Sequence, residues 1–112
     1  MSQPVPHTAP AALLLIYIDE TDTWGASRIP LYEAIVEKLF ELGINGATVH
    51  LGIMGYGANR RLHRKRLFGV TDDRPVTISA VDTEERLRGA LGAIRPMVTE
   101  GLVFLAPGEI VT

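Results

Sequence analysis

Four stretches of the chain have the hydrophobic pattern of β-strands. Residues 12–18 form a continuous apolar run, which is typical of a strand buried on both faces. Residues 47–54 alternate between apolar and polar positions, as a strand does. Residues 75–81 and 102–105 are further short runs rich in apolar and β-branched side chains. The pattern therefore predicts four short strands.

Two further stretches have the period of amphipathic helices. In residues 30–42 apolar side chains recur every three or four positions, and Gly43 is the expected left-handed residue after the last turn. A second helix is expected after Asp82, which would cap it together with Glu85 in the third helical position. Pro96 is expected to end this helix, because proline lacks a backbone N–H and clashes with the preceding turn.

The order β-α-β-β-α-β of these elements is typical of a ferredoxin-like fold. The sequence thus predicts an α+β sandwich in which two helices cover one face of a four-stranded antiparallel sheet. We expect a disordered tail at residues 1–11, which include three prolines, and a single domain at residues 12–112. Pro107 and Gly108 are expected to break the last strand and leave a short edge strand at residues 109–112.

The first strand is apolar on both of its faces, and the fourth strand is apolar throughout. Leu13, Leu15 and Tyr17 lie on one face of the first strand, whereas alternate positions from Leu14 to Ile18 lie on the other. Because two helices cover only one face of the sheet, we expect another subunit to cover the second face. The alternative is that the tail or the last few residues fold over it.

Composition excludes several classes of site. The chain has 112 residues, 46% of them hydrophobic, and no cysteine, so disulfides, zinc–thiolate sites and thiol catalysis are excluded. The lack of cysteine fits a cytoplasmic protein. The apolar run at residues 9–18 is too short to span a bilayer, and without a basic region before it we do not interpret it as a signal peptide. No serine has a histidine and an acid at motif spacing, so we expect neither an enzyme nor a cofactor.

Charge is distributed unevenly along the chain. The net charge is −2, yet residues 55–71 carry +5 and no acid, so the remainder sums to −7. The cations of this stretch are Arg60, Arg61, Arg64, Lys65 and Arg66. About twenty residues separate the second and third predicted strands here, and a connection of this length is usually functional or disordered.

Glycines and arginines in this connection predict an anion site. The glycines would allow positive φ and close approach of the backbone, and arginine pairs well with phosphate and carboxylate. The predicted ligand-binding residues are Gly52, Gly55, Tyr56, Gly57, Asn59, Arg60, Arg61, His63 and Arg64. Neither a P-loop nor a dinucleotide fingerprint is present. The alternatives are a solvated basic loop and, less favoured in an acidic chain with few aromatics, contact with nucleic acid or an anionic membrane.

A metal site is the weakest interpretation. The acidic residues Asp19, Glu20 and Asp22 offer oxygen ligands for a divalent cation, but a polar strand end and turn is the favoured interpretation. His50, expected on the face away from the helices, and His63 are too few and too dispersed to specify a transition metal. We therefore predict no metal ligands.

The stretches PLYEAIVEKLFELGINGATVHLGIMGYGANRRLH, at residues 30–63, and RPVTISAVDTEERL, at residues 74–87, are similar to a known family. They resemble the PII-like family called domain of unknown function 190, related to PII signal-transduction and divalent-cation-tolerance proteins. The resemblance covers about residues 13–111 and is most specific at residues 46–49 and 52–63. It implies a ferredoxin-like fold and a homotrimer with its sheets packed around a central axis.

The resemblance also implies a role for the long connection. PII proteins bind ATP or ADP between subunits and contact partners through the loop between their second and third strands, the position of residues 55–74 here. The chain departs from PII proteins after Val81, where Asp82 leads directly into a helix and leaves no room for their phosphate-binding loop.

We therefore expect a non-enzymatic trimeric regulatory protein that senses a small anionic ligand, with a nucleotide as one candidate, through residues 55–74. The alternatives are an interaction module that docks this basic loop on an acidic or membrane-protein partner, and a metal-tolerance protein.

Overall fold

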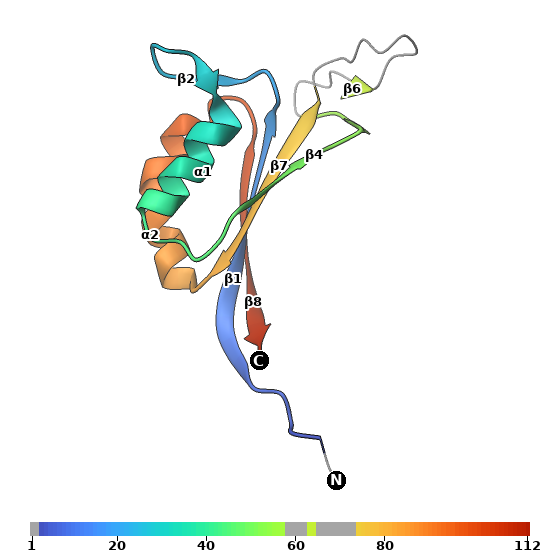
Figure 1. Ribbon diagram of the computed structural model, residues 1–112, viewed down its shortest axis with the longest axis vertical. Coiled ribbons are helices and arrows are strands. Elements are labelled where there is room, and N and C mark those ends of the chain that lie inside the picture. Colours follow the sequence, from blue (N-terminus) through green and yellow to red (C-terminus); the bar gives the residue numbers. More distant parts are fainter. Residues whose placement is uncertain (1–2, 58–62, 65–73) are drawn as a thin grey trace.

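The computed structural model describes residues 3–57, 63–64 and 74–112, and four of its strands form one antiparallel sheet (Figure 1). The strand order is β4-β7-β1-β8. Both helices lie on the same face of this sheet (Figure 1). The strands are β1 Thr8–Asp19, β4 Thr48–Leu51, β7 Pro75–Asp82 and β8 Leu102–Val111, and the helices are α1 Leu31–Glu41 and α2 Glu84–Ile94. This arrangement confirms the predicted α+β, ferredoxin-like fold.

Smaller elements complete the connections. The strands β2 Thr23–Trp24 and β3 Ile29–Pro30 pair with each other between β1 and α1. The strands β5 Met54–Gly55 and β6 His63–Arg64 pair with each other between β4 and β7. A 3-10 turn, η1 Arg95–Met97, follows α2, so Pro96 ends the α-helix as predicted.

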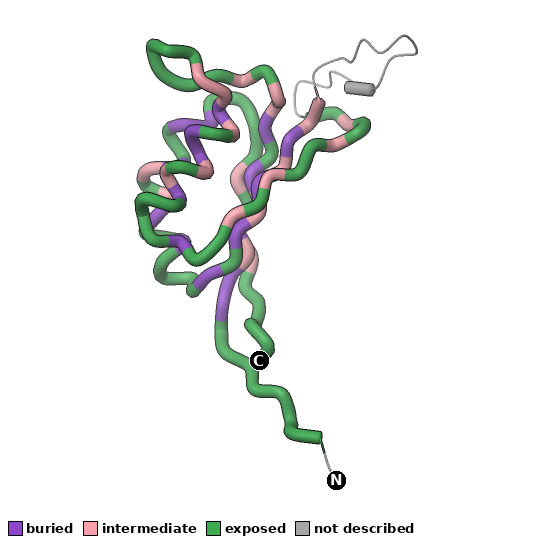
Figure 2. Tube along the Cα trace, in the orientation of Figure 1, coloured by how far each residue is buried: buried purple, intermediate pink, exposed green. Residues whose placement is uncertain are grey.

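The core lies between the sheet and the helices, and β1 is its centre (Figure 2). Leu14 and Ile16 are fully buried, and Ile16 lies opposite Ile78 of β7 and Val103 of β8. The helices contribute the buried side chains Leu31, Ala34, Ile35, Leu39, Leu87, Ala90 and Ile94. The assignment of residues to the two faces of β1 is therefore confirmed, since Leu14, Ile16 and Ile18 are all buried on the helix side.

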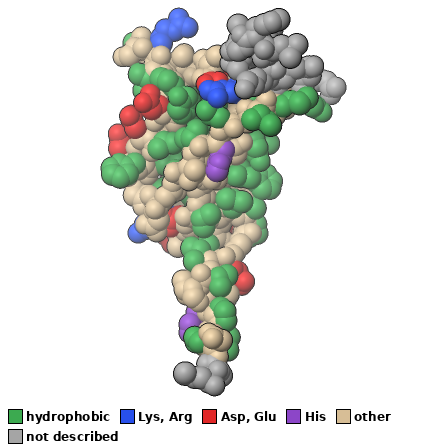
Figure 3. Space-filling model, turned by 45° about the vertical axis from the view of Figure 1, so that its right-hand side comes forward, with side chains coloured by type: hydrophobic (Ala, Val, Ile, Leu, Met, Phe, Trp, Pro, Cys, Tyr) green, Lys and Arg blue, Asp and Glu red, His purple; other side chains and the backbone are tan. Residues whose placement is uncertain are grey.

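The other face of the sheet carries a hydrophobic surface that we call the open face. Figure 3 shows hydrophobic side chains gathered on the side of the sheet away from the helices. Its members share one face by strand register: Leu13, Leu15, Tyr17, Val81, Leu102 and Phe104. Tyr17 is 41% exposed, Phe104 48% and Leu102 56%. The described residues at both chain ends do not fold over this face, which corrects that alternative.

Both chain ends instead extend the sheet as a two-stranded arm (Figure 1). The strand β1 begins at Thr8, so residues 8–11 pair with β8 although the sequence placed them in the tail. The strand β8 continues to Val111 through Pro107, so the predicted break there is wrong. Pro107 is tolerated because β8 is an edge strand. Pro10 is tolerated because β7 pairs with β1 only from Ala12 onward, so Pro10 has a partner strand on one side only.

Two further boundaries differ from the sequence expectation. The N-cap of α2 is Thr83, whose hydroxyl accepts a hydrogen bond from Arg86 N at 3.2 Å, so the prediction of Asp82 was wrong. Asp82 is 2% exposed and accepts hydrogen bonds from the backbone N–H groups of Asn45 and Thr83. The strand β4 ends at Leu51, three residues earlier than predicted, because the backbone pairs with β7 only that far.

Within the described part of the chain, none of the helices has both the length and the hydrophobicity needed to span a membrane.

Candidate functional site

The connection between β4 and β7 leaves and re-enters the sheet at the same end. Leu51 pairs with Val76 as the last pair of these strands, and Gly52 N donates a hydrogen bond to Pro75 O at 2.7 Å. Farther along, β5 pairs with β6, with Gly55 opposite His63. We call residues 55–74 the basic segment, and Gly52 with Pro75 forms its base.

Two glycines of the predicted site have a packing role. A Cβ on Gly52 would lie 2.7 Å from Pro75 Cγ, and a Cβ on Gly55 would lie 3.3 Å from the same atom. Neither these two nor Gly57 has φ in the left-handed region, which among the described glycines occurs at positions 25, 43 and 101. Glycine is thus required at Gly52 for close approach to Pro75, and the predicted use of positive φ was wrong.

The remaining predicted site residues are only partly placed. Tyr56 is 62% exposed beside the base. Asn59, Arg60 and Arg61 lie outside the described residues. For His63 and Arg64 the structure describes the backbone pairing in β6. Binding of an anion by these residues therefore stays a prediction.

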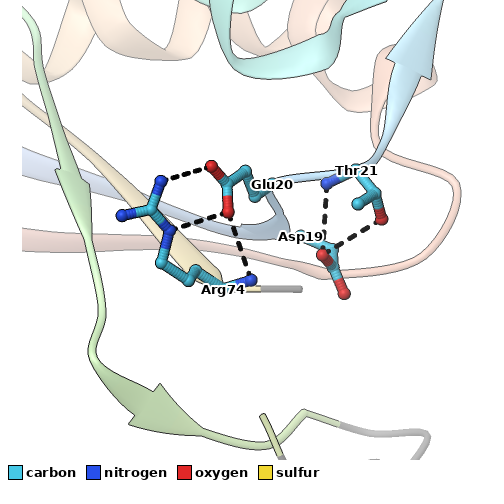
Figure 4. A network of polar contacts seen from close by, with 4 residues as sticks. All are labelled: Asp19, Glu20, Thr21 and Arg74. Carbon is cyan, nitrogen blue, oxygen red and sulfur yellow. Dashed lines mark hydrogen bonds and ion pairs between the residues drawn. The ribbon is translucent and has the colours of Figure 1, made fainter. Parts of the chain in front are cut away.

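An ion pair that the sequence analysis missed lies where the basic segment ends (Figure 4). Arg74 Nε donates to Glu20 Oε2 at 2.8 Å, and Arg74 Nη2 donates to Glu20 Oε1 at 2.5 Å. Glu20 N also donates to Arg74 O at 2.9 Å, which extends the β1–β7 pairing beyond Asp19 and Pro75. The hydrogen bonds from Arg74 hold the pKa of the Glu20 carboxyl below its usual value of 4.5.

The acidic residues after β1 form a turn, as the favoured sequence interpretation held (Figure 4). Asp19 N donates to Asp22 Oδ2 at 3.0 Å, and both the N–H and the hydroxyl of Thr21 donate to Asp19 Oδ1. Asp22 O accepts a hydrogen bond from Leu31 N at 2.7 Å, which joins the turn to the start of α1. Among the described residues no group of three histidines or carboxylates is arranged to hold a metal ion.

The Glu20–Arg74 pair predicts a specific pH dependence. The folded protein lowers the pKa of Glu20, so the pair stabilises the fold above the unfolded value of 4.5 and loses this effect as pH falls through the lower folded value. We expect Glu20→Gln to destabilise the protein at neutral pH. Its stability should match that of wild type at a pH where Glu20 is protonated in both the folded and the unfolded state. Urea unfolding from neutral pH to about pH 3 measures the difference. A difference that persists unchanged at the acidic end would contradict this assignment.

A shallow groove lies at the opposite end of β4. It has a volume of about 320 Å³ and is lined by residues 45–48 and 79–81. Thr48 and Ser79 pair across β4 and β7, and both share the face that carries Leu15. The groove forms because the pairing of β4 with β7 begins at Thr48, so residues 45–47 do not pair with β7. The sequence analysis noted residues 46–49 only as part of the family resemblance.

Comparison with known proteins gives consistent results. The family model DUF190, described as uncharacterized ACR, matches residues 11–110. A UPF0166 protein of Aquifex aeolicus (strain VF5) is 30% identical over 99 residues, which cover 88% of this chain and 91% of that protein. A UPF0166 protein of Methanocaldococcus jannaschii is 33% identical over 96 residues, which cover 85% and 86%.

Among solved structures, the fold is similar to CPII from Thiomonas intermedia K12, a nitrogen regulatory PII-like protein bound to ADP, AMP and bicarbonate. The TM-score is 0.70 at 21% sequence identity, and the match covers 93% of this chain and 91% of CPII. At this identity the likeness shows a shared PII-like fold.

Proposed function

We propose a regulatory, non-enzymatic function for this chain, which belongs to the DUF190 family and has a PII-like fold. In this proposal the protein binds a small anionic ligand through the basic segment. An adenine nucleotide is the leading candidate, because CPII, with the same fold, was solved with ADP and AMP.

The observation that carries the proposal is the set of hydrogen bonds that fix both ends of the basic segment to the sheet. One end is held by the Gly52–Pro75 hydrogen bond, and the other by the backbone and side-chain contacts between Glu20 and Arg74. Five cations lie between these anchors in the sequence. A charged segment whose two ends are held on a scaffold suits ligand binding, because these ends need little further ordering when a ligand binds.

The open face supports self-assembly, and we propose a homotrimer. Its large side chains remain about half exposed in the single chain, as the exposures of Tyr17, Leu102 and Phe104 show. Burial of this apolar area against other copies would stabilise the assembly by about 25 cal/mol of free energy per Å² removed from water.

Docking of a protein partner is the second candidate function. Three large apolar side chains at the start of the connection are well exposed: Ile53 at 86%, Met54 at 58% and Tyr56 at 62%. Apolar side chains followed in the sequence by cations suit a partner with an acidic rim and a hydrophobic centre.

Thermal unfolding with ATP, ADP and AMP at physiological salt tests the nucleotide proposal. Ligand at 100 times its dissociation constant stabilises by about 2.7 kcal/mol, which corresponds to about 10 °C in a domain of this size. We expect this shift in wild type and its loss when Arg60, Arg61 and Arg64 are all changed to alanine.

The matched control changes Arg28, Lys38 and Arg88 to alanine, which removes the same charge elsewhere. Lys38 and Arg88 form exposed ion pairs with Glu41 and Glu84, and such pairs contribute little to stability. This control is expected to keep the shift. No shift in wild type with any of the three nucleotides would refute nucleotide binding and leave partner docking, which pull-down with the same variants would then examine.

A further inference from the structure

We propose that Arg74 is an anion-binding residue, and that the Glu20 carboxylate occupies its binding position until the ligand's phosphate or carboxylate group displaces it. This inference rests on the proposed function and assigns to it two residues outside the predicted site. In the ligand-free protein, Glu20 then acts as an internal substitute for the ligand.

The geometry of the pair is that of ligand recognition. Arg74 Nε and Nη2 each bond a different oxygen of Glu20, at 2.8 and 2.5 Å. This planar two-point contact is also how a guanidinium binds two oxygens of a phosphate. By contrast, Arg88 directs both of its donors to one oxygen of Glu84 within the same helix.

Exposure makes the exchange feasible. The side chain of Arg74 is 41% exposed and that of Glu20 is 28% exposed. A displaced Glu20 would therefore reach water, whereas a carboxylate displaced inside the core would be left unpaired at high cost. A phosphate group carries more negative charge than one carboxylate, so it competes favourably for the guanidinium.

The backbone keeps Arg74 in place during such an exchange. Glu20 N donates to Arg74 O at 2.9 Å, a contact that does not involve either side chain's charge. The next residue, Pro75, accepts the Gly52 hydrogen bond at the base. Arg74 thus presents its side chain from a fixed position at the end of the basic segment.

The exchange would also link the ligand to α1. Glu20 lies in the turn at residues 19–22, and Asp22 O in this turn accepts the hydrogen bond from Leu31 N at the start of α1. When the ligand displaces the Glu20 side chain, this turn keeps its backbone bond to Arg74 and loses the side-chain contact with the guanidinium. The ligand would therefore bind next to a turn that is hydrogen-bonded to the first helix.

Calorimetric titration of the full chain with ADP and with inorganic pyrophosphate tests the exchange. Glu20→Gln removes the competing charge, so we expect it to bind both probes about three- to tenfold tighter than wild type. Arg74→Gln is expected to bind at least about tenfold more weakly. The control Glu84→Gln breaks the exposed Glu84–Arg88 pair and is expected to bind as wild type does.

The outcomes separate this inference from the proposed function. If wild type binds neither probe, the proposed nucleotide binding is refuted and the exchange with it. If wild type binds but Glu20→Gln binds equally or more weakly, or Arg74→Gln is unchanged, the exchange is overturned while the proposed function stands. A purely structural ion pair predicts that both variants weaken binding.

A measurement on wild type keeps the test independent of variant folding. Nuclear magnetic resonance titration of the Glu20 carboxyl carbon reports its pKa with and without saturating pyrophosphate. Displacement from Arg74 removes the hydrogen bonds that lower this pKa, so we expect it to rise toward 4.5 in the complex. An unchanged pKa in the saturated complex would overturn the exchange.

Discussion

Replacement of Gly101 by alanine is expected to lower the unfolding free energy by about 2 to 4 kcal/mol. Gly101 has φ +150°, and a Cβ there would lie 2.3 Å from Tyr17 O and 3.0 Å from Val98 Cγ1. Tyr17 belongs to β1, which is held by strands on both sides, so its carbonyl has little freedom to move away. Chemical denaturation with urea measures the loss.

The matched control for this substitution is Gly89→Ala. Gly89 lies inside α2, and a Cβ built there meets no atom within 4 Å. Alanine is favoured over glycine in a helix interior, so this variant should be more stable than wild type by about 0.5 to 1 kcal/mol. A Gly101→Ala protein within about 0.5 kcal/mol of wild type would show that the start of β8 is packed differently.

If the chain forms the proposed homotrimer, replacement of Phe104 by glutamate is expected to dissociate it into single chains of 12.2 kDa. Phe104 lies opposite Leu15 at the centre of the open face and is 48% exposed in the single chain. The glutamate is therefore tolerated in the monomer but would be buried without a partner in an interface, at a cost of several kcal/mol for each subunit. Light scattering during gel filtration measures the mass, and circular dichroism verifies folding.

Phe40→Glu provides the same chemical change at a different surface. Phe40 lies on α1 and is 83% exposed, on the helical layer and not on the open face. This variant should assemble as wild type does. A wild-type monomer at micromolar concentration would contradict the assembly itself, and a Phe104→Glu protein of wild-type mass would place the interface elsewhere.

Much of the fold was predictable because its elements follow local hydrophobic periods. The run at the centre of β1 and the three- and four-residue spacing in α1 depend only on neighbours in the chain. Gly43 has φ 78°, as expected for the residue that follows a helix. The element boundaries that were predicted wrongly depend on a partner strand. The strand β8 continues through Pro107 because it pairs with β1 alone, and its other edge needs no N–H donor from the proline.

The candidate site was less predictable, since a spacing in the sequence does not specify which backbone approaches which. The sequence suggested that Gly52 was needed for its φ, whereas the close contact with Pro75 explains the glycine. Asp82 has the sequence features of a cap, yet β7 extends to it, and its buried carboxylate accepts a hydrogen bond from Asn45 N.

By itself the sequence determined the order of the elements, the apolar character of both faces of β1 and the concentration of cations in the basic segment, because each is a property of consecutive residues. Only the tertiary structure decided that Arg74 donates hydrogen bonds to Glu20, 54 positions away, and that Gly52 N donates to Pro75 O. The physical reason is strand register: antiparallel pairing of β1 with β7 and of β7 with β4 brings these distant residues together at one end of the sheet.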